Sequence, residues 1–148
     1  MMNVEIDTKE YVAALKEMVE QGMEVSMTVS GTSMEPFLIH GRDRIYFQKP
    51  EGTIKKGDMV FFQRKTGEYV MHRVMKVRNH QYYLAGDHQT FLEGPIEKTQ
   101  IFAKVVSVER AGVWITEKEH IWKFYANWWR RLFWVRKVAN KFRRIIWK

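Results

Sequence analysis

The chain begins with apolar residues at helical spacing and then changes to alternation. Over residues 8–22, one helical face carries the apolar side chains Tyr11, Ala14, Leu15, Met18 and Val19. This spacing predicts a helix that Thr8 caps and Gly22 ends. From Glu24 onward, apolar and polar residues alternate as far as Ser30, which predicts a half-buried strand.

Further strands follow, each short and bounded by turn residues. The pattern predicts six of them, at 44–48, 58–64, 69–78, 81–85, 101–110 and 113–116. Gly67 lies within a turn at 65–68 that is typical of a hairpin. Many short strands separated by turn signals predict a mainly β body, built as a barrel or a sandwich.

The end of the chain has a different pattern. From residue 117, apolar residues step by four and three along one helical seam: Ile121, Tyr125, Trp128, Leu132, Val135, Ala139, Phe142 and Ile146. No Gly or Pro interrupts them, so we expect one helix of about 30 residues, roughly 45 Å long. That length exceeds the width of so small a body, so much of the apolar face should meet another surface. We therefore predict a β domain with its N-terminal helix at 1–116 and an amphipathic helix at 117–148.

The net charge of +8 belongs to this tail. Residues 117–148 hold ten Lys and Arg against two acids, whereas residues 1–116 hold 15 of each. Five of the six tryptophans also lie in the tail. A helix with Trp and Phe on one face and basic residues opposite is typical of helices that lie in an anionic bilayer interface. The residues expected to bind the membrane are Trp128, Trp129, Arg130, Arg131 and Trp134.

The same tail is compatible with other partners. It can pack back on the β body, bind a peptide or protein, or bind nucleic acid through basic residues interleaved with aromatic ones. Bulky aromatic residues in the seam argue against a coiled coil. Of these surfaces we favour an anionic membrane, and we do not favour nucleic acid.

Composition narrows the class of protein further. A chain of 148 residues suits one domain with a sizeable core. The absence of cysteine excludes a disulfide framework, a cysteine–zinc site and a cysteine nucleophile. The longest uncharged run, between Glu24 and Glu35, is too short for a transmembrane helix or for the apolar part of a usual secretory signal. We expect a cytoplasmic protein, peripheral at the inner face of the cell membrane, with no cofactor and no metal.

The segment 30–38 carries the most distinctive chemistry. A predicted strand ends at Gly31, and Ser33 follows in a turn that Pro36 makes rigid. Such a turn presents a hydroxyl beside backbone N–H groups, which a serine nucleophile requires together with a nearby base. Taken alone, the segment is also typical of an ordinary strand-to-turn junction.

Four motifs in order give this segment a context. Gly31-x-Ser33-Met34-x-Pro36 resembles the nucleophile box of the signal peptidase I clan of serine peptidases. The later boxes of that clan resemble the stretches 57–62, 71–74, and Gly86-Asp87 followed by 101–106. The resemblance covers roughly residues 24–110. It implies the β body that signal peptidases share with self-cleaving repressor domains, and it implies serine peptidase activity.

The resemblance also implies roles for individual residues. In the second box, where the clan has Lys or His before Arg, this chain has His72, as in the Ser/His type of archaea, spore-formers and the endoplasmic reticulum. A neutral imidazole can take the Ser33 proton at neutral pH. A carboxylate usually orients such a base. Asp87 and Glu93 are the two candidates, with a slight preference for Glu93.

The nucleophile box also supplies the residues expected to form the oxyanion hole or to contact substrate: Gly31, Thr32, Met34 and Pro36. Gly31 stands where some members of the clan have a serine hydroxyl, so we expect the Ser33 N–H to carry more of the oxyanion stabilisation. The remaining histidines of the body, His40, His80 and His88, are expected at the surface.

Two functions therefore follow. The first is a serine endopeptidase of signal peptidase type that cleaves a leader or signal-like peptide at the membrane surface, with substrate paired to the strand 25–30. The alternative is a catalytically inactive or self-cleaving module of the same fold that binds a peptide or partner. Only about 22 residues precede the β body, too few for a helix-turn-helix, and no Ala-Gly self-cleavage dipeptide lies among them. Both observations argue against a self-cleaving repressor, and a catalytically inactive module that holds a peptide stays an alternative.

Overall fold

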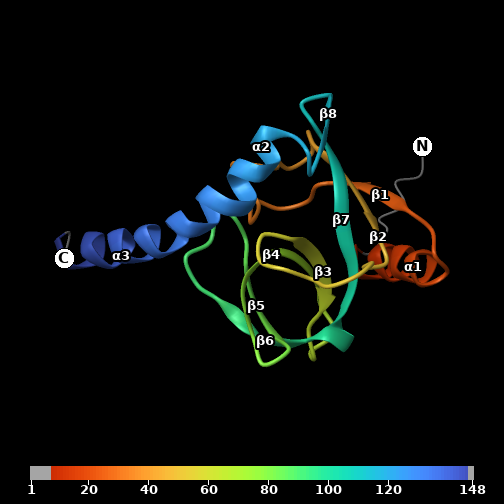
Figure 1. The fold of residues 1–148 in the computed structure, drawn as a ribbon, viewed down its shortest axis with the longest axis horizontal. Coiled ribbons are helices and arrows are strands. Elements are labelled where there is room, and N and C mark those ends of the chain that lie inside the picture. The colour runs from red at the N-terminus through yellow and green to blue at the C-terminus, as the bar shows by residue number, and fades with distance from the viewer. Residues whose placement is uncertain (1–7, 147–148) are drawn as a thin grey trace, which may run out of the picture.

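A computed structural model of the chain describes residues 8–146 (Figure 1). Its body consists of α1 (Thr8–Glu20), β1 (Val25–Thr28), β2 (Arg44–Gln48), β3 (Met59–Gln63), β4 (Tyr69–Arg78), β5 (Gln81–Ala85), β6 (Glu93–Glu97), a 3₁₀ turn (Lys98–Gln100), β7 (Ile101–Arg110) and β8 (Val113–Thr116). The C-terminal helix follows as α2 (His120–Lys123), a π-helical segment (Phe124–Trp129) and α3 (Arg130–Ile146). This order confirms a mainly β body between a short N-terminal and a long C-terminal helix.

The eight strands form one antiparallel sheet in the order β1-β2-β7-β3-β4-β5-β6, and β8 pairs with β7. Five of the predicted strands match the structure to the residue, at 44–48, 69–78, 81–85, 101–110 and 113–116. The prediction lacked β6, because Gly94 and Pro95 interrupt its pattern. Proline is tolerated there because β6 ends the strand order and pairs only with β5.

Helix α1 packs beside β1 and β7 (Figure 1). Its buried stripe is Val12, Leu15 and Val19, spaced by three and four as one helical face requires. Tyr11 and Met18, which the spacing had placed on the same face, are exposed instead. The predicted capping side chain of Thr8 lies outside the described residues. The helix ends where predicted, since Gly22 follows with φ +91°.

The first half of the tail packs on the β body. Trp122 and Tyr125 are buried, with ring centroids 6.1 Å and 4.7 Å from that of Phe37. One turn past the π-helical segment, the fully buried Phe133 joins a small apolar cluster with Met75. Phe37 belongs to the segment that carries Ser33, so the helix supports that segment from behind.

Of the predicted seam, Tyr125 packs on the body, whereas Trp128, Leu132, Val135 and Phe142 are exposed. We predicted that Trp129 would bind a membrane, but it packs against Tyr125 at 5.6 Å between ring centroids. Its indole N–H also donates a 2.9 Å hydrogen bond to the carbonyl oxygen of Asp87. Trp122, Trp129 and Phe133 share the body-facing side, since residues 7 and 11 positions apart lie on one face of a helix.

Beyond Phe133 the helix α3 extends away from the body (Figure 1). Along the C-terminal helix, Trp128, Arg131 and Trp134 are exposed, and Arg130 is half-buried. Among the helices of residues 8–146, none combines the length and apolar composition that crossing a bilayer requires.

Candidate active site

Ser33 lies half-buried in the turn between β1 and β2. Gly31 enters this turn with φ +86°, a conformation that favours glycine, and its N–H donates to Nδ1 of His40 at 2.8 Å. On the other side of Ser33, the side chain of Met34 is buried, and its carbonyl accepts the N–H of Leu38 at 3.0 Å. The turn is therefore anchored on both sides of the serine.

The loop after β5 holds Ser33 from a second direction. The N–H of His88 donates to the carbonyl oxygen of Ser33 at 2.9 Å. A Cβ added to Gly86 would lie 2.9 Å from the Ser33 Cβ and would overlap the Ser33 carbonyl oxygen. The side-chain oxygen of Gln89 accepts the Gly86 N–H at 2.9 Å and fixes the loop. Only glycine fits at position 86 while Ser33 keeps this place.

His72 lies on β4 with its side chain buried. The β4–β5 register ends with Arg73 opposite Ala85, so His72 and Gly86 are the next residues of the two segments. A Cβ added to Gly86 would meet Ser33, so the Ser33 turn lies against the loop that begins where the pairing of β4 with β5 ends.

The environment of His72 keeps its imidazole neutral. Burial lowers its pKa to about 4; the charge of Glu93 raises the pKa and that of Arg64 lowers it. Its Nδ1 is buried and has no hydrogen-bond partner among the described residues. At neutral pH this group is unprotonated and free to accept a proton.

Both candidate acids are occupied by arginines. Asp87 accepts from Arg73 through both oxygens, Nε at 2.7 Å and Nη2 at 2.9 Å, and both side chains are buried. Glu93 accepts from Arg64 in the same way, at 2.8 Å and 2.7 Å. In the described part of the chain, neither acid bonds His72. Glu93 acts on His72 through its charge, whereas Asp87 is bonded to the buried Arg73. The catalytic roles of Ser33, His72 and the acids stay predictions.

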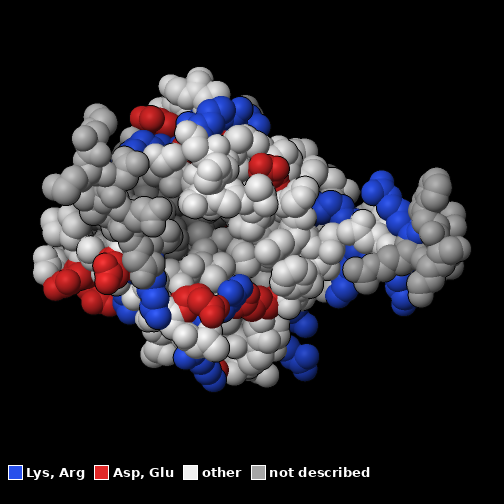
Figure 2. Space-filling model, turned by 180° about the vertical axis from the view of Figure 1, so that it is seen from behind, with Lys and Arg blue, Asp and Glu red and all other residues white. Residues whose placement is uncertain are grey.

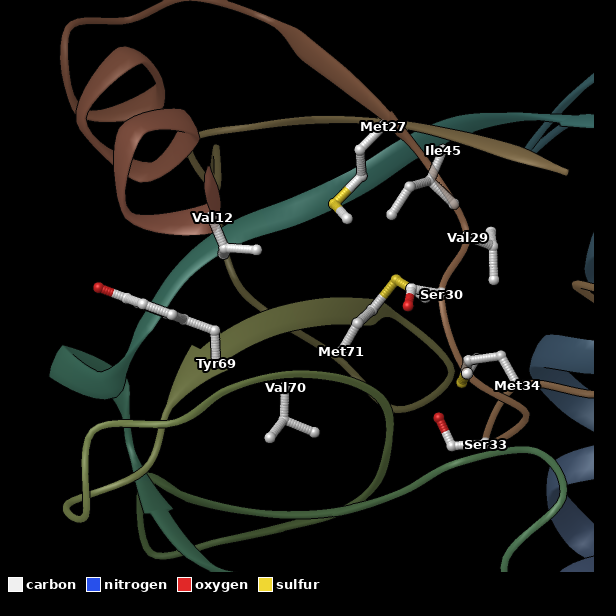
Figure 3. Close-up of a pocket in the computed structure, with 11 residues that line it drawn as sticks. Val12, Met27, Val29, Ser30, Ser33, Met34, Ile45, Tyr69, Val70 and Met71 are labelled. Carbon is white, nitrogen blue, oxygen red and sulfur yellow. The ribbon is translucent and has the colours of Figure 1, made fainter. Parts of the chain in front are cut away.

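A pocket of about 240 Å³ opens beside Ser33. Figure 3 shows Ser33 at one end of this pocket with its hydroxyl directed inward. The walls are mostly apolar and come from α1, β1, β2, the Ser33 turn and β4: Val12, Met27, Val29, Ser30, Gly31, Met34, Ile45, Tyr69, Val70 and Met71. Of the residues predicted to contact substrate, Gly31 and Met34 line the pocket, whereas Thr32 and Pro36 do not. Pro36 instead faces a groove beside α3.

Two strand edges border this pocket. β1 ends the strand order, and its known pairing is with β2 alone. β4 pairs with β3 from residue 69 but with β5 only from Arg73, so residues 69–72 pair on one side. Met27 and Met71 of these two strands both line the pocket. An extended peptide laid along the pocket would find backbone donors and acceptors on both strands.

A family model described as Peptidase S24-like matches residues 2–106. This match covers more than two thirds of the chain and includes Ser33, His72 and both candidate acids. The chain belongs to the Peptidase S24-like family. It is thus a peptidase-type protein of the serine class. A comparison with curated proteins gave no match. The match ends before the C-terminal helix.

Three residues around the site of this S24-like peptidase were not identified from the sequence. His40 is exposed, as predicted for a surface histidine, but its ring also fixes Gly31. Arg64 binds Glu93 across 29 positions of sequence, and Trp129 reaches Asp87 across 42. No motif marks Arg64 or Trp129, because such pairings depend on the register of the folded sheet.

Proposed function

We propose that the protein is a serine endopeptidase in which Ser33 is the nucleophile and His72 the base. One observation carries the proposal: Ser33, whose hydroxyl lies at the end of an apolar pocket, packs against Gly86 where the β4–β5 pairing ends, and the neutral buried imidazole of His72 is the next residue of β4 at that end. A nucleophilic serine needs such a base nearby, and the base must be unprotonated at the working pH.

The reaction follows from these groups. The Ser33 oxygen attacks the scissile carbonyl carbon, and the hydroxyl proton passes to His72. The oxyanion that forms is stabilised by the Ser33 N–H, for which no described residue is an acceptor. His72 then gives its proton to the leaving amine as the C–N bond breaks. A water molecule, deprotonated by the same imidazole, hydrolyses the acyl-enzyme and restores Ser33.

The pocket supports a peptide substrate bound as an added strand. A segment between the free edge of β1 and residues 69–72 of β4 places a carbonyl beside Ser33 and side chains in the apolar pocket. The resemblance to signal peptidases adds the expectation of small residues before the cut. We propose a leader or signal-like peptide at a membrane surface as the substrate, because such peptides are extended and partly apolar.

The test is labelling with a fluorophosphonate probe, which reacts with activated serines. We expect the natural protein to be labelled at Ser33, and Ser33→Ala and His72→Ala to lose the label by at least a hundredfold. Thr66→Ala, which changes a hydroxyl in the β3–β4 turn outside the pocket, is the matched control and should label normally. Labelling that persists in Ser33→Ala would overturn the nucleophile. A folded natural protein that neither labels nor cleaves peptides would favour the inactive binding module, and cleavage within its own chain would favour the self-cleaving one.

A further inference from the structure

The C-terminal helix presents a large apolar face to solvent. The exposed side chains are Phe124, Trp128, Leu132, Trp134, Val135, Val138 and Phe142. Trp128 is 63% exposed and Val135 62%, values unusual for residues of this size. Most of them step by four, four, three and seven, so they form one stripe along the helix. We call these seven residues the apolar stripe.

Positive charge accompanies the apolar stripe. Between His120 and Ile146 the sequence has eight Lys and Arg and no Asp or Glu. Exposed cations flank the stripe on the described part of the helix: Lys123, Arg131, Lys137, Lys141 and Arg143. In Figure 2 the projecting helix carries blue side chains with no red among them. The body-facing side, with Trp129 and Phe133, is separate from this stripe.

We infer that this helix binds an anionic lipid surface, with the apolar stripe in the interface and the flanking cations at the headgroups. Aliphatic residues such as Leu132 and Val138 offer little to phosphates or to stacked bases, so nucleic acid does not account for the stripe. A second copy would bring two helices without acids together, and their like charges would repel. An anionic bilayer satisfies both the apolar side chains and the cations.

That a peptidase works at a membrane rests on the proposed function. Lipid binding by the helix is measured without any substrate. We propose flotation of the full chain with vesicles of phosphatidylcholine and phosphatidylglycerol at 3:1, and with pure phosphatidylcholine. The stripe variant Trp128→Gln/Leu132→Gln/Val135→Gln should lower the partition coefficient at least tenfold. The matched control is Val113→Gln/Trp114→Gln, which removes exposed apolar residues from the β7–β8 hairpin and should change nothing.

Four results decide whether the helix binds lipid. Neutralising Arg131, Lys137 and Lys141 to Gln should weaken binding to the anionic vesicles by about a hundredfold, at about fivefold per charge. Equal flotation of the stripe variant and the natural protein would overturn the inference. The inference would also be overturned if neither the natural protein nor the stripe variant floats with the vesicles. Dimers in solution would then favour a second copy as the partner, and binding to single-stranded DNA that the stripe variant retains would favour nucleic acid. Ser33→Ala should bind lipid like the natural protein, because it keeps the helix and lacks only the proposed nucleophile. A failure of the proposed catalytic function therefore leaves the lipid-binding result unaffected.

A different observation carries a second inference, that Trp129 is a positioning residue for the proposed nucleophile. Its indole N–H bonds the carbonyl oxygen of Asp87, and the next residue, His88, bonds the carbonyl oxygen of Ser33, each at 2.9 Å. The guanidinium of Arg136 lies over the Trp129 ring, 4.5 Å from its centroid. The helix thus reaches the serine through two consecutive hydrogen bonds.

This second inference also rests on the proposed function, and Trp129→Phe tests it. Phenylalanine keeps the ring in place but removes the donor, so kcat for peptide cleavage should fall about tenfold while KM and the melting temperature change little. Trp114→Phe, at the exposed tryptophan of the β7–β8 hairpin, is the control and should leave all three unchanged. If the natural protein has no peptidase activity, that result contradicts the proposed function and not the contact between Trp129 and the Ser33 loop. A Trp129→Phe protein with unchanged kcat, or with loss of stability equal to its loss of activity, would overturn the positioning role.

Discussion

His72 is a buried imidazole whose Nδ1 has no partner among the described residues. Burial without a hydrogen bond disfavours the charged form, and this is the main reason its pKa falls to about 4. In the unfolded chain the same group titrates near 6.5. Between these two pKa values, His72 is protonated in the unfolded chain and neutral in the folded protein. The free energy of unfolding therefore falls as the pH drops from about 6.5 towards 4. The loss amounts to about 3 kcal/mol at most.

The first prediction concerns the pH dependence of activity. Because the base stays neutral down to about pH 4, kcat/KM should be flat from pH 7 to about 5 and should fall only near pH 4. Glu93→Gln removes a charge that raises the pKa of His72 and should move the fall to lower pH. Arg64→Gln removes a charge that lowers it and should move the fall upward. A fall near pH 6.5 in the natural protein, or shifts of the same sign in both variants, would contradict this.

The second prediction concerns Gly86. An alanine there would drive its Cβ into the Ser33 carbonyl, so Gly86→Ala should destabilise the protein by about 1–3 kcal/mol and abolish labelling of Ser33. Urea unfolding and probe labelling measure the two effects. Gly112→Asn is the control, since nothing lies within 4 Å of a Cβ there and asparagine tolerates its positive φ of +82°. If Gly86→Ala behaves like this control, the tight packing of the serine is refuted.

The motif residues Ser33 and His72 could be found from the sequence because local spacing marks them. Their surroundings could not. The sequence offers Asp87 and Glu93 as two candidate carboxylates, whereas in the folded sheet Asp87 bonds Arg73 and Glu93 bonds Arg64. Which arginine reaches which acid depends on strand register, and register is a property of the whole sheet.

At the scale of elements, the buried pair of Arg73 and Asp87 links three parts of the fold. Arg73 lies on β4, Asp87 follows β5, and Arg73 also donates to the carbonyl of Gly57 before β3 at 2.8 Å. Both charges are shielded from water, so each depends on the other. The pair therefore fixes the loop that holds Ser33 in its turn.

The third prediction follows from this pair. Asp87→Asn leaves a buried guanidinium without its counter-charge and should lower the free energy of unfolding by about 3–5 kcal/mol. Glu68→Gln, which weakens an exposed pair with Arg64, should cost about 1 kcal/mol or less. Urea unfolding of the two variants compares them directly. Equal effects would show that the Arg73–Asp87 pair contributes no more than a surface contact.

Strand positions were predictable from alternation and turns, and five strands agree to the residue. Two elements show the limit of such patterns. β6 contains Gly94 and Pro95, so its existence depends on pairing with β5 and not on local propensity. In the tail, spacing by three and four placed Tyr125, Trp128 and Leu132 on one seam. In the structure Tyr125 is buried and the other two are exposed, while Trp129 and Phe133 pack on the body.

At the scale of the whole molecule, one side of the C-terminal helix packs on the β body and the other side is exposed to solvent. Trp122, Tyr125 and Phe133 are buried against the body, while the apolar stripe faces solvent. A tail with both roles cannot be removed at residue 116 without exposing the body surface that includes Phe37.

The fourth prediction separates these roles by truncation. Removing 117–148 should lower the free energy of unfolding by about 5 kcal/mol, because three buried aromatic side chains are lost. Removing only 138–148 should change it by about 1 kcal/mol or less, since Phe133 and the contacts before it remain. Urea unfolding of both chains gives the comparison. A tail that serves only as an anchor would leave both truncated proteins as stable as the full chain.

The π-helical segment Phe124–Trp129 also fixes the phase between the two faces of the tail. Each residue of an α-helix turns the chain by about 100°, so one residue more or fewer within this segment rotates everything after it by that angle. Deleting Asn127 would preserve the composition, charge and amphipathic pattern of α3. It would also aim the apolar stripe in a new direction relative to the pocket beside Ser33. The length of a single helical turn thus sets the direction of the apolar stripe relative to that pocket.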